Sequence, residues 1–289
     1  MTDAAILGRF VWHELMTTDT KSTAGFFAKV AGWKTQPWPQ DPTYAMFVAG
    51  RRPVAGLMVL PEEAKAMGAP PNWLTYMGTP SVDDTTRLAV TLGGKILKAA
   101  ADIPAAGRFA VLQDPQGAVF AVYTPVQDQS SDAPAAVGDF SWHELATTDW
   151  LSALTFYRRL FGWEATSAME MGPGMGTYQM FGRGGRSLGG MFNKPPQMQG
   201  PAAWLAYIRV GDAKKTAVTV KKLGGQIMNG PMEVAGGGWI AQGVDLQGAV
   251  FAVHSSKPAA KKARPKKKKP VTKKKPARKT ARRPKKRRR

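Results

Sequence analysis

The chain has 289 residues, and its 41 Lys and Arg against 20 Asp and Glu give a formal net charge of +21. The segment Lys257–Arg289 holds 20 of the basic residues and no acidic one, so residues 1–256 carry 21 basic and 20 acidic side chains, a net charge of +1. There is no cysteine, which excludes disulfides, thiolate nucleophiles and Cys-based zinc sites. No signal peptide and no apolar run of about 20 residues is visible, so we expect a cytoplasmic protein without a membrane span.

An internal repeat organises residues 8–256. The tetrapeptide WHEL at 12–15 returns at 142–145, and DPQGAVFAV at 114–122 returns as DLQGAVFAV at 245–253. Self-similarity at a fixed offset indicates duplicated structural units. We therefore predict two domains, residues 8–125 and 138–256, joined by a linker at 126–137 that is rich in Ser, Asp, Pro and Ala.

The elements of the first copy follow one pattern twice. Alternating residues predict strands, and amphipathic stretches that end in glycine predict helices. In chain order we expect a strand at 9–18, a helix at 20–32 ended by Gly32, strands at 43–50 and 52–60, a strand at 72–80, a helix at 82–94 and strands at 94–100, 107–114 and 117–125. The predicted class is α+β, with a βαβββ unit occurring twice in each domain and helices on one face of a curved, largely antiparallel sheet. In the second copy, GRGGRSLGG at 182–190 is expected to be a hairpin rather than a phosphate-binding loop.

Four segments together resemble a known superfamily: WHELMTTD, FFAKVAGW, LGGKI and DPQGAVFAVYTP. They are similar to the vicinal-oxygen-chelate proteins, which include glyoxalase I, bleomycin resistance proteins and extradiol dioxygenases. The resemblance covers residues 8–125 and 138–255. It implies that the βαβββ units of each domain close around a cupped cavity. In catalytic members, a divalent metal in that cavity chelates two neighbouring substrate oxygens.

The metal positions of that superfamily are filled here by residues that do not bind metals. Neighbouring residues of a strand point to opposite faces, so His13 and Glu14 cannot grip one ion. The resemblance places the ligand positions at Trp12, Leu74 and Ala121, and at Trp142, Leu205 and Ala252. A catalytic zinc or iron site needs about three protein ligands, so we predict no metal ligands and no cofactor. A metal-dependent lyase or dioxygenase that uses another site is the alternative.

Glu14 and Glu144 are the tentative catalytic residues. Each would be a carboxylate beside an indole, and burial would raise its pKa and suit it to act as a general base or as an anchor for a ligand. A structural carboxylate that caps backbone N–H groups is an equal alternative. Cavity-lining side chains that we expect to bind a small organic ligand, although core packing is the alternative for each, are Trp12, Tyr44, Met58, Tyr76, Trp142, Tyr178, Met191 and Tyr207. His13 and His143 are expected between sheet and helix or at a sheet rim, with a ring nitrogen bonded to the backbone.

The tail at 257–289 is rich in Lys, Arg, Pro and Ala, and we expect it to be disordered because it has no apolar face. It resembles the tails of linker histones, which implies sequence-independent binding of nucleic acid through phosphate contacts. The predicted contact residues are Lys261, Lys262, Arg264, Lys266, Lys267, Lys268, Lys269, Lys273, Lys274, Lys275, Arg278, Lys279, Arg282, Arg283, Lys285, Lys286, Arg287, Arg288 and Arg289. DNA is the expected partner, ahead of RNA, polyphosphate or anionic lipid, and nucleoid association would follow. A solubilising tail, or a nucleoid-associated protein with a passive folded scaffold, are the alternatives.

Overall fold

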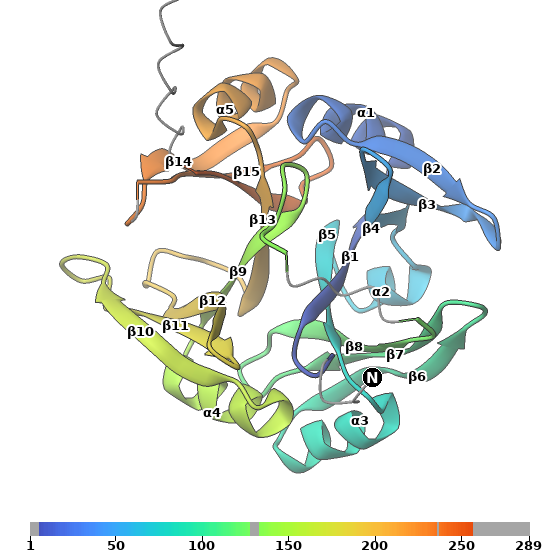
Figure 1. Cartoon of the computed structure of the whole chain (residues 1–289), viewed down its shortest axis with the longest axis vertical. Coiled ribbons are helices and arrows are strands. Elements are labelled where there is room, and N and C mark those ends of the chain that lie inside the picture. The colour runs from blue at the N-terminus through green and yellow to red at the C-terminus, as the bar shows by residue number, and fades with distance from the viewer. Residues whose placement is uncertain (1–5, 128–132, 236, 257–289) are drawn as a thin grey trace, which may run out of the picture. The chain divides into compact units, whose positions relative to one another are not determined.

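The computed structural model describes residues 6–127, 133–235 and 237–256. The predicted tail at 257–289 and the linker residues 128–132 lie outside these described residues. Within them, two eight-stranded sheets and five helices confirm the predicted α+β class and the repeated βαβββ unit (Figure 1). In the described part of the chain, no helix combines the length and the apolar character needed to cross a membrane.

The elements follow each other in the same order in both copies, apart from the short helix α2. The first copy contains β1 (Phe10–Thr17), α1 (Thr20–Val30), β2 (Lys34–Trp38), β3 (Asp41–Ala49), β4 (Arg52–Val59), α2 (Glu62–Ala66), β5 (Asn72–Gly78), α3 (Val82–Thr91), β6 (Lys95–Ile103), β7 (Gly107–Gln113) and β8 (Val119–Pro125). The second contains β9 (Phe140–Thr147), α4 (Trp150–Phe161), β10 (Glu164–Glu170), β11 (Thr177–Arg183), β12 (Arg186–Asn193), β13 (Ala203–Arg209), α5 (Ala213–Lys222), β14 (Gln226–Glu233), β15 (Trp239–Val244) and β16 (Val250–Ser255).

Each sheet places its WHEL strand at the centre. The first sheet has the order β2-β3-β4-β1-β5-β8-β7-β6, and the second repeats it as β10-β11-β12-β9-β13-β16-β15-β14. Strand β1 runs parallel to β4 and antiparallel to β5. The predicted hairpin at 182–190 is confirmed, because β11 and β12 pair antiparallel up to Arg183 opposite Arg186. The central position of β1 and β9 brings strands from both units of a copy around one face of the WHEL segment.

Caps fix where the helices begin and end. The Asp19 side chain accepts a hydrogen bond from the Ser22 backbone N–H at 2.9 Å, and Asp149 caps α4 in the same way. Such caps satisfy backbone donors that have no partner within the helix. Helix α4 ends at Phe161, with Gly162 as its left-handed cap. Helix α1 ends at Val30 with Ala31 as its cap, and the predicted Gly32 follows in the left-handed conformation at a φ of +72°, where glycine commonly terminates a helix.

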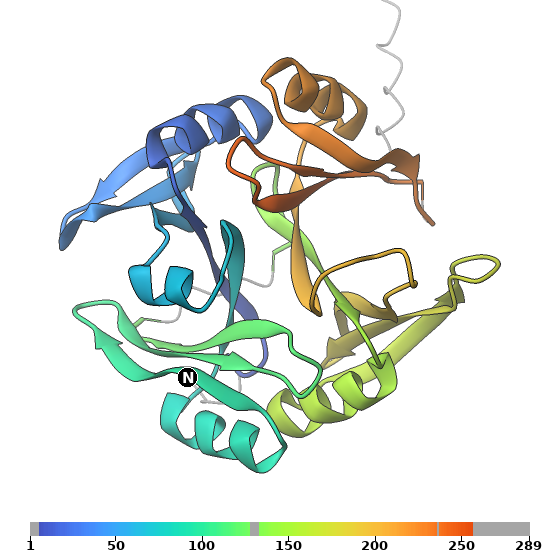
Figure 2. The ribbon, with the colours of Figure 1, turned by 180° about the vertical axis from the view of Figure 1, so that it is seen from behind.

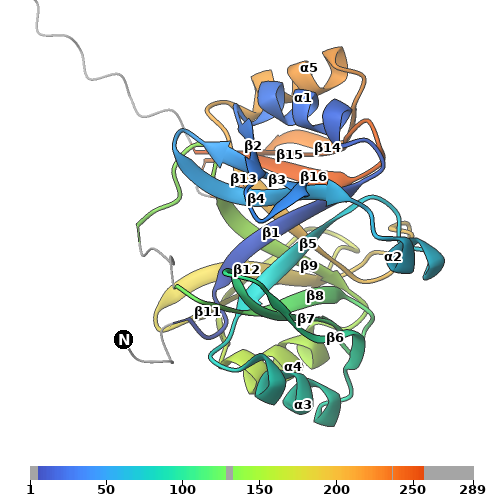
Figure 3. The same ribbon diagram turned by 90° about the vertical axis from the view of Figure 1, so that its right-hand side faces the viewer.

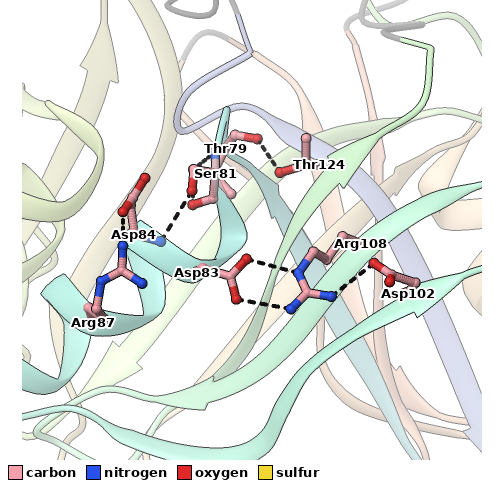
Figure 4. A network of polar contacts seen from close by, with 8 residues as sticks. All are labelled: Thr79, Ser81, Asp83, Asp84, Arg87, Asp102, Arg108 and Thr124. Carbon is pink, nitrogen blue, oxygen red and sulfur yellow. Dashed lines mark hydrogen bonds and ion pairs between the residues drawn. The ribbon is translucent and has the colours of Figure 1, made fainter.

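A polar network attaches α3 to its sheet (Figure 4). Arg108 on β7 donates to both oxygens of Asp83 on α3, at 2.9 and 3.0 Å, and to Asp102 on β6 at 2.9 Å. The Ser81 hydroxyl caps the helix by accepting from the Asp84 backbone N–H. These ion pairs are largely exposed to solvent, which screens them, so they contribute little to stability. They orient the helix, and apolar packing supplies most of the stability.

The apolar core is shared between the two copies. One cluster joins Leu15 and Phe27 of the first copy to Ile208 and Val220 of the second. A second apolar cluster joins β7, β8 and α3 of the first copy to α4 and Trp163 of the second. Helix α1 accordingly lies beside α5, and α3 lies beside α4, as Figures 1, 2 and 3 show from three directions. The two copies therefore bury much of their apolar surface against each other.

Two tryptophans close this shared core with matching hydrogen bonds. The Trp33 indole of the first copy donates to the Gly138 carbonyl at the start of the second, at 2.8 Å. Trp163 of the second copy donates to the Gly8 carbonyl at the start of the first, at 2.9 Å. Both indoles are buried, as expected for packing residues. Each copy thus fastens the beginning of the other through a buried, fully hydrogen-bonded side chain.

Candidate functional site

The predicted residues of the first copy form a hydrogen-bonded group, here called the first cluster: Trp12, Glu14, Tyr44 and Tyr76. The Trp12 indole donates to the Tyr44 hydroxyl at 3.1 Å, and the Tyr76 hydroxyl donates to Glu14 Oε1 at 3.0 Å. Tyr44 also hydrogen-bonds Glu14. The strand period places Trp12 and Glu14 on one face of β1, and Tyr76 of β5 lies directly opposite Trp12. The Glu14 carboxylate therefore forms hydrogen bonds with two tyrosine hydroxyls, and the Trp12 indole lies beside it.

The second cluster consists of Trp142, Glu144, Tyr178 and Tyr207. Trp142 donates to the Tyr178 hydroxyl at 2.8 Å, and Tyr178 donates to Glu144 Oε2 at 3.1 Å. Tyr207 donates to Glu144 Oε1, also at 3.1 Å. A further side chain, Gln242 of β15, donates to Glu144 Oε1 at 3.2 Å. The arrangement of the first cluster is thus repeated, with one added donor.

A glycine makes room for the tyrosine in each cluster. A Cβ on Gly56 of β4 would overlap the Tyr44 hydroxyl, and one on Gly190 of β12 would overlap the Tyr178 ring. Gly56 is the register partner of Glu14, and Gly190 is that of Glu144. The missing side chain lets each phenol lie across β4 or β12 and reach the carboxylate, which is the close approach that glycine permits.

Burial dominates the electrostatics of both carboxylates. Desolvation raises the pKa of Glu14, while hydrogen bonds from Tyr44 and Tyr76 and the charge of Lys98 act in the opposite direction. Desolvation also raises the pKa of Glu144, against bonds from Tyr207, Tyr178 and Gln242. A carboxyl group with a raised pKa is a better proton acceptor than an exposed one. Each cluster can therefore accept a hydrogen bond or a proton from a bound molecule.

The first cluster opens into a cleft of about 1560 Å³. Trp12, Glu14, Tyr44, Met58 and Tyr76 all line it. Phe109 and Tyr123 of the same sheet add aromatic surface, and each lies about 6 Å from the Tyr76 ring, at 6.2 and 6.1 Å between centroids. Ligand sites have this character, with mostly apolar walls and a few placed polar groups.

Met191 does not lie where the sequence predicted it. The strand position that matches Met58 is Phe192, whose ring stacks on Tyr178 at 6.0 Å. Met191 faces the opposite side of β12 and is fully buried in the shared core. The prediction aligned two methionines by residue type, and that alignment is off by one residue, which exchanges the two faces of a strand.

His13 and His143 also differ from the prediction, because they contact each other. Their Nε2 atoms lie 2.8 Å apart across the boundary between the copies. The His13 ring stacks on Phe140 and the His143 ring on Phe10, with centroids 3.6 and 3.5 Å apart. Only His143 bonds the backbone, at Leu188, as the sequence had suggested for both. Both lie on the far face of their strands from the glutamates, so they belong to the interface between the copies.

Four polar or aromatic neighbours of the clusters were missed by the sequence reasoning: Lys98, Phe109, Asn229 and Gln242. They lie on β6, β7, β14 and β15, two or three strands away from the strands of Tyr76 and Tyr207. The offset of 131 residues between the copies pairs Lys98 with Asn229, and it pairs Val111 with Gln242. Alternation along β7 and β15 was the available signal, because Phe109 and Gln242 fall on the faces opposite the buried Ala110 and Ala241.

The donors in these clusters do not fit a catalytic metal. Each cluster offers one carboxylate, whose partners are phenols that donate hydrogen bonds to it. Among the residues that the structure describes, no three His, Cys, Asp or Glu side chains gather in a group that could hold a metal ion. A hard divalent cation would need further carboxylates, imidazoles or waters in place of the indole and the alanine.

Known proteins are similar to this chain in sequence and in fold. A family profile described as the Glyoxalase/Bleomycin resistance protein/Dioxygenase superfamily matches residues 140–247. The putative glyoxylase CFP32 of Mycobacterium tuberculosis is 31% identical over 245 residues, which cover 84% of this chain and 92% of that protein. The anthracycline biosynthesis protein DauV of a Streptomyces species is 27% identical over 262 residues, covering 85% and 92%. Among solved structures, a Mn(II)-bound glyoxalase from Novosphingobium aromaticivorans superimposes with a TM-score of 0.57 at 18% identity, over 86% of this chain and 82% of that one.

Proposed function

The chain belongs to the glyoxalase/bleomycin resistance protein/dioxygenase superfamily, and from this premise we propose that it binds a small organic molecule over its indole–phenol–carboxylate clusters without a bound metal. The observation that carries the proposal is the first cluster in the lining of the cleft, with Glu14 hydrogen-bonded by two phenols. Pockets of this kind orient a ligand with a few polar groups and hold it by apolar contact.

The side chains suggest a flat, partly aromatic ligand. Trp12, Tyr44 and Phe109 line the cleft, and an aromatic pair with a bound ring would contribute about 0.5–1.5 kcal/mol beyond the area that it buries. A relative that is named for anthracycline biosynthesis supports the same ligand class, because anthracyclines are flat ring systems. Glu14 then serves as the hydrogen-bond acceptor that fixes the orientation of the ring. It is also the group that would take a proton in an enzymatic variant of the proposal.

The proposal is tested by binding and metal content together. We expect purified protein to hold far less than one equivalent of zinc, iron, manganese or nickel, and tryptophan fluorescence in the presence of a chelator to detect binding within a panel of flat aromatic compounds. Trp12→Phe should reduce the fluorescence response, and Glu14→Gln should weaken binding. Glu62→Gln is the matched control, because Glu62 lies exposed on α2 and pairs with Lys65. Binding that needs about one equivalent of added metal would overturn the proposal.

For the tail at 257–289 we propose non-specific binding of DNA. The specific support is its 20 basic side chains in 33 residues, against a net charge of +1 for residues 1–256. Each phosphate that a Lys or Arg neutralises releases counterions, so the logarithm of the affinity should fall linearly with the logarithm of salt concentration, with a slope of about −0.9 per phosphate. Deleting 257–289 should abolish duplex binding and leave the thermal transition unchanged. Truncated protein that still shifts duplex DNA at physiological salt would place the binding surface on residues 1–256.

A further inference from the structure

One row of paired side chains crosses each sheet and distinguishes the two clusters. In the second sheet, successive register partners on β9, β13, β16, β15 and β14 are Trp142, Tyr207, Ala252, Gln242 and Asn229. In the first sheet, the partners at the same positions on β1, β5, β8, β7 and β6 are Trp12, Tyr76, Ala121, Val111 and Lys98. The rows are identical at the first three positions and differ at the last two.

In the second sheet, a carboxamide of the chain itself occupies the row. Gln242 Nε2 lies 2.6 Å from the Tyr207 hydroxyl and 3.2 Å from Glu144 Oε1, so its two N–H groups have acceptors. Gln242 Oε1 accepts a hydrogen bond from Asn229 Nδ2 at 3.2 Å. All the hydrogen-bonding groups of this amide except the second lone pair of its oxygen are thereby satisfied. The second cluster therefore binds a carboxamide, and this carboxamide is the side chain of Gln242 in the same chain.

In the first sheet, the same position holds the short apolar side chain of Val111, which packs against the buried cluster of Leu74, Tyr76 and Ala121. An isopropyl group neither donates nor accepts a hydrogen bond. The matching acceptors are still in place, because Glu14 and the Tyr76 hydroxyl have the geometry of Glu144 and Tyr207. The matching donor is Lys98, whose Nζ lies 5.6 Å from the centre of the Phe109 ring and whose charge acts on Glu14.

We infer that the first cluster takes a small flat ligand whose edge carries a hydrogen-bond donor beside an acceptor, as in a primary carboxamide or a hydroxyl next to a carbonyl. The donor of the ligand faces Glu14 and Tyr76, as the Gln242 amide faces Glu144 and Tyr207, and its acceptor faces Lys98. This inference rests on the proposed function and names the ligand class for it. The cleft agrees with the choice of cluster, because its lining includes Glu14, Tyr76 and Phe109 but none of the four second-cluster residues. Lys98 and Val111 lie outside that lining, on the strands beyond Tyr76.

Three probes of similar shape test the ligand class in the full chain: benzamide carries a donor and an acceptor, acetophenone only an acceptor, and ethylbenzene neither. Probes of this size make few contacts, so we expect millimolar affinities, which ligand-observed NMR or calorimetry can measure. We expect benzamide to bind at least tenfold more tightly than acetophenone, with ethylbenzene weakest. Val111→Gln should abolish benzamide binding, whereas the isosteric control Val111→Thr should retain it. Equal affinity for benzamide and acetophenone, or unchanged benzamide binding to Val111→Gln, would contradict the inference.

The second cluster supplies a matched experiment. Gln242→Ala removes an acetamide-sized group, so acetamide should restore the lost thermal stability of this variant, while acetone, which lacks the donor, should not. Rescue by both compounds alike would show that only volume matters, and would overturn the inference. The same data distinguish failure of this inference from failure of the proposed function. If other flat compounds perturb Trp12 fluorescence but benzamide binds no more tightly than acetophenone, the inference is wrong and the proposed ligand binding stands. If no compound perturbs Trp12, both are wrong.

Discussion

His13 Nε2 lies 2.8 Å from His143 Nε2, and this hydrogen bond joins the same residue of the two sequence repeats across their shared boundary. His143 uses its Nδ1–H on the Leu188 carbonyl, so its Nε2 must accept from the Nε2–H of His13. This assignment leaves His13 Nδ1 unprotonated, buried and without a hydrogen-bond partner among the described residues. Both imidazoles are therefore held in the neutral form inside the interface.

Stability should depend on pH through this pair. Burial and the neighbouring His143 lower the pKa of His13 well below 6.5, and burial lowers the pKa of His143 to about 3. A histidine with a depressed folded-state pKa takes up its proton first in the unfolded chain, so its contribution is complete above about pH 6.5 and is lost as the pH falls. The free energy of unfolding should drop by roughly 1.4 kcal/mol per pH unit for each histidine between pH 6 and pH 4.

Denaturant unfolding at several pH values measures this dependence. The raised pKa values of Glu14 and Glu144 act with the opposite sign, so a comparison of variants is needed. The double variant His13→Gln with His143→Gln should lose most of the slope below pH 6.5, and His254→Gln, whose ring is only partly buried, should keep it. The same slope in the double variant and in the wild type would show that the pair does not titrate with unfolding.

Phe27→Tyr should stabilise the protein. Tyr157, the repeat equivalent of Phe27, donates to Asp114 Oδ2 at 3.0 Å and accepts from the Trp204 indole at 3.0 Å. On the other side, the equivalents Asp245 Oδ2 and the Trp73 indole are buried and have no partner among the described residues. A phenol there would satisfy both, and each buried unpaired group costs about 1–3 kcal/mol.

The reverse change, Tyr157→Phe, provides the comparison for thermal or denaturant unfolding. It would leave Asp114 and Trp204 without this partner and should destabilise the protein by about 1–3 kcal/mol. The ring arrangement at Phe27 already matches that at Tyr157. The ring centroids of Phe27 and Trp73 lie 5.5 Å apart, those of Tyr157 and Trp204 lie 5.4 Å apart, and both pairs are edge-on. A midpoint for Phe27→Tyr below that of the wild type would contradict this account.

Gly56→Ala should displace Tyr44 and weaken ligand binding without unfolding the protein. The new methyl group would occupy the place of the Tyr44 hydroxyl, so the phenol would leave Glu14 and Trp12. We expect at least a tenfold loss of affinity in the fluorescence assay. Gly25→Ala is the control, because Gly25 lies on α1 with open space around it and alanine favours the helix by up to about 1 kcal/mol. Equal affinities in the two variants would exclude a role for the position of Tyr44.

Repetition made much of the fold and of the site predictable. The fixed offsets around WHEL and DPQGAVFAV imply that both copies fold alike, and strand alternation alone places Trp12 with Glu14 and turns His13 away. The tyrosines of the clusters could be predicted as site residues because equivalent tyrosines occur in both copies. These inferences rest on local periodicity, which the sequence carries directly.

The errors arose where contacts cross strands or copies. Met191 was misplaced because a residue-type match overrode the register, and Gln242 was missed because its strand joins the cluster only through sheet order. The His13–His143 contact depends on how the copies pack, and no local pattern contains that information. The information that the sequence lacked was therefore which strands and copies pack together over long sequence distances. Secondary-structure propensity did not cause these errors.

The indole N–H signals of Trp12 and Trp142 report most directly on metal-independent ligand binding in the first cluster. Both indoles donate to a tyrosine hydroxyl, and Trp12→Phe and Trp142→Phe assign their NMR signals. Titration of the ¹⁵N-labelled full chain with benzamide in the presence of a chelator should shift the Trp12 signal in a saturable manner and leave Trp142 in place. A Trp12 signal that moves only after a divalent metal is added, or that never moves while Trp142 does, would contradict the account.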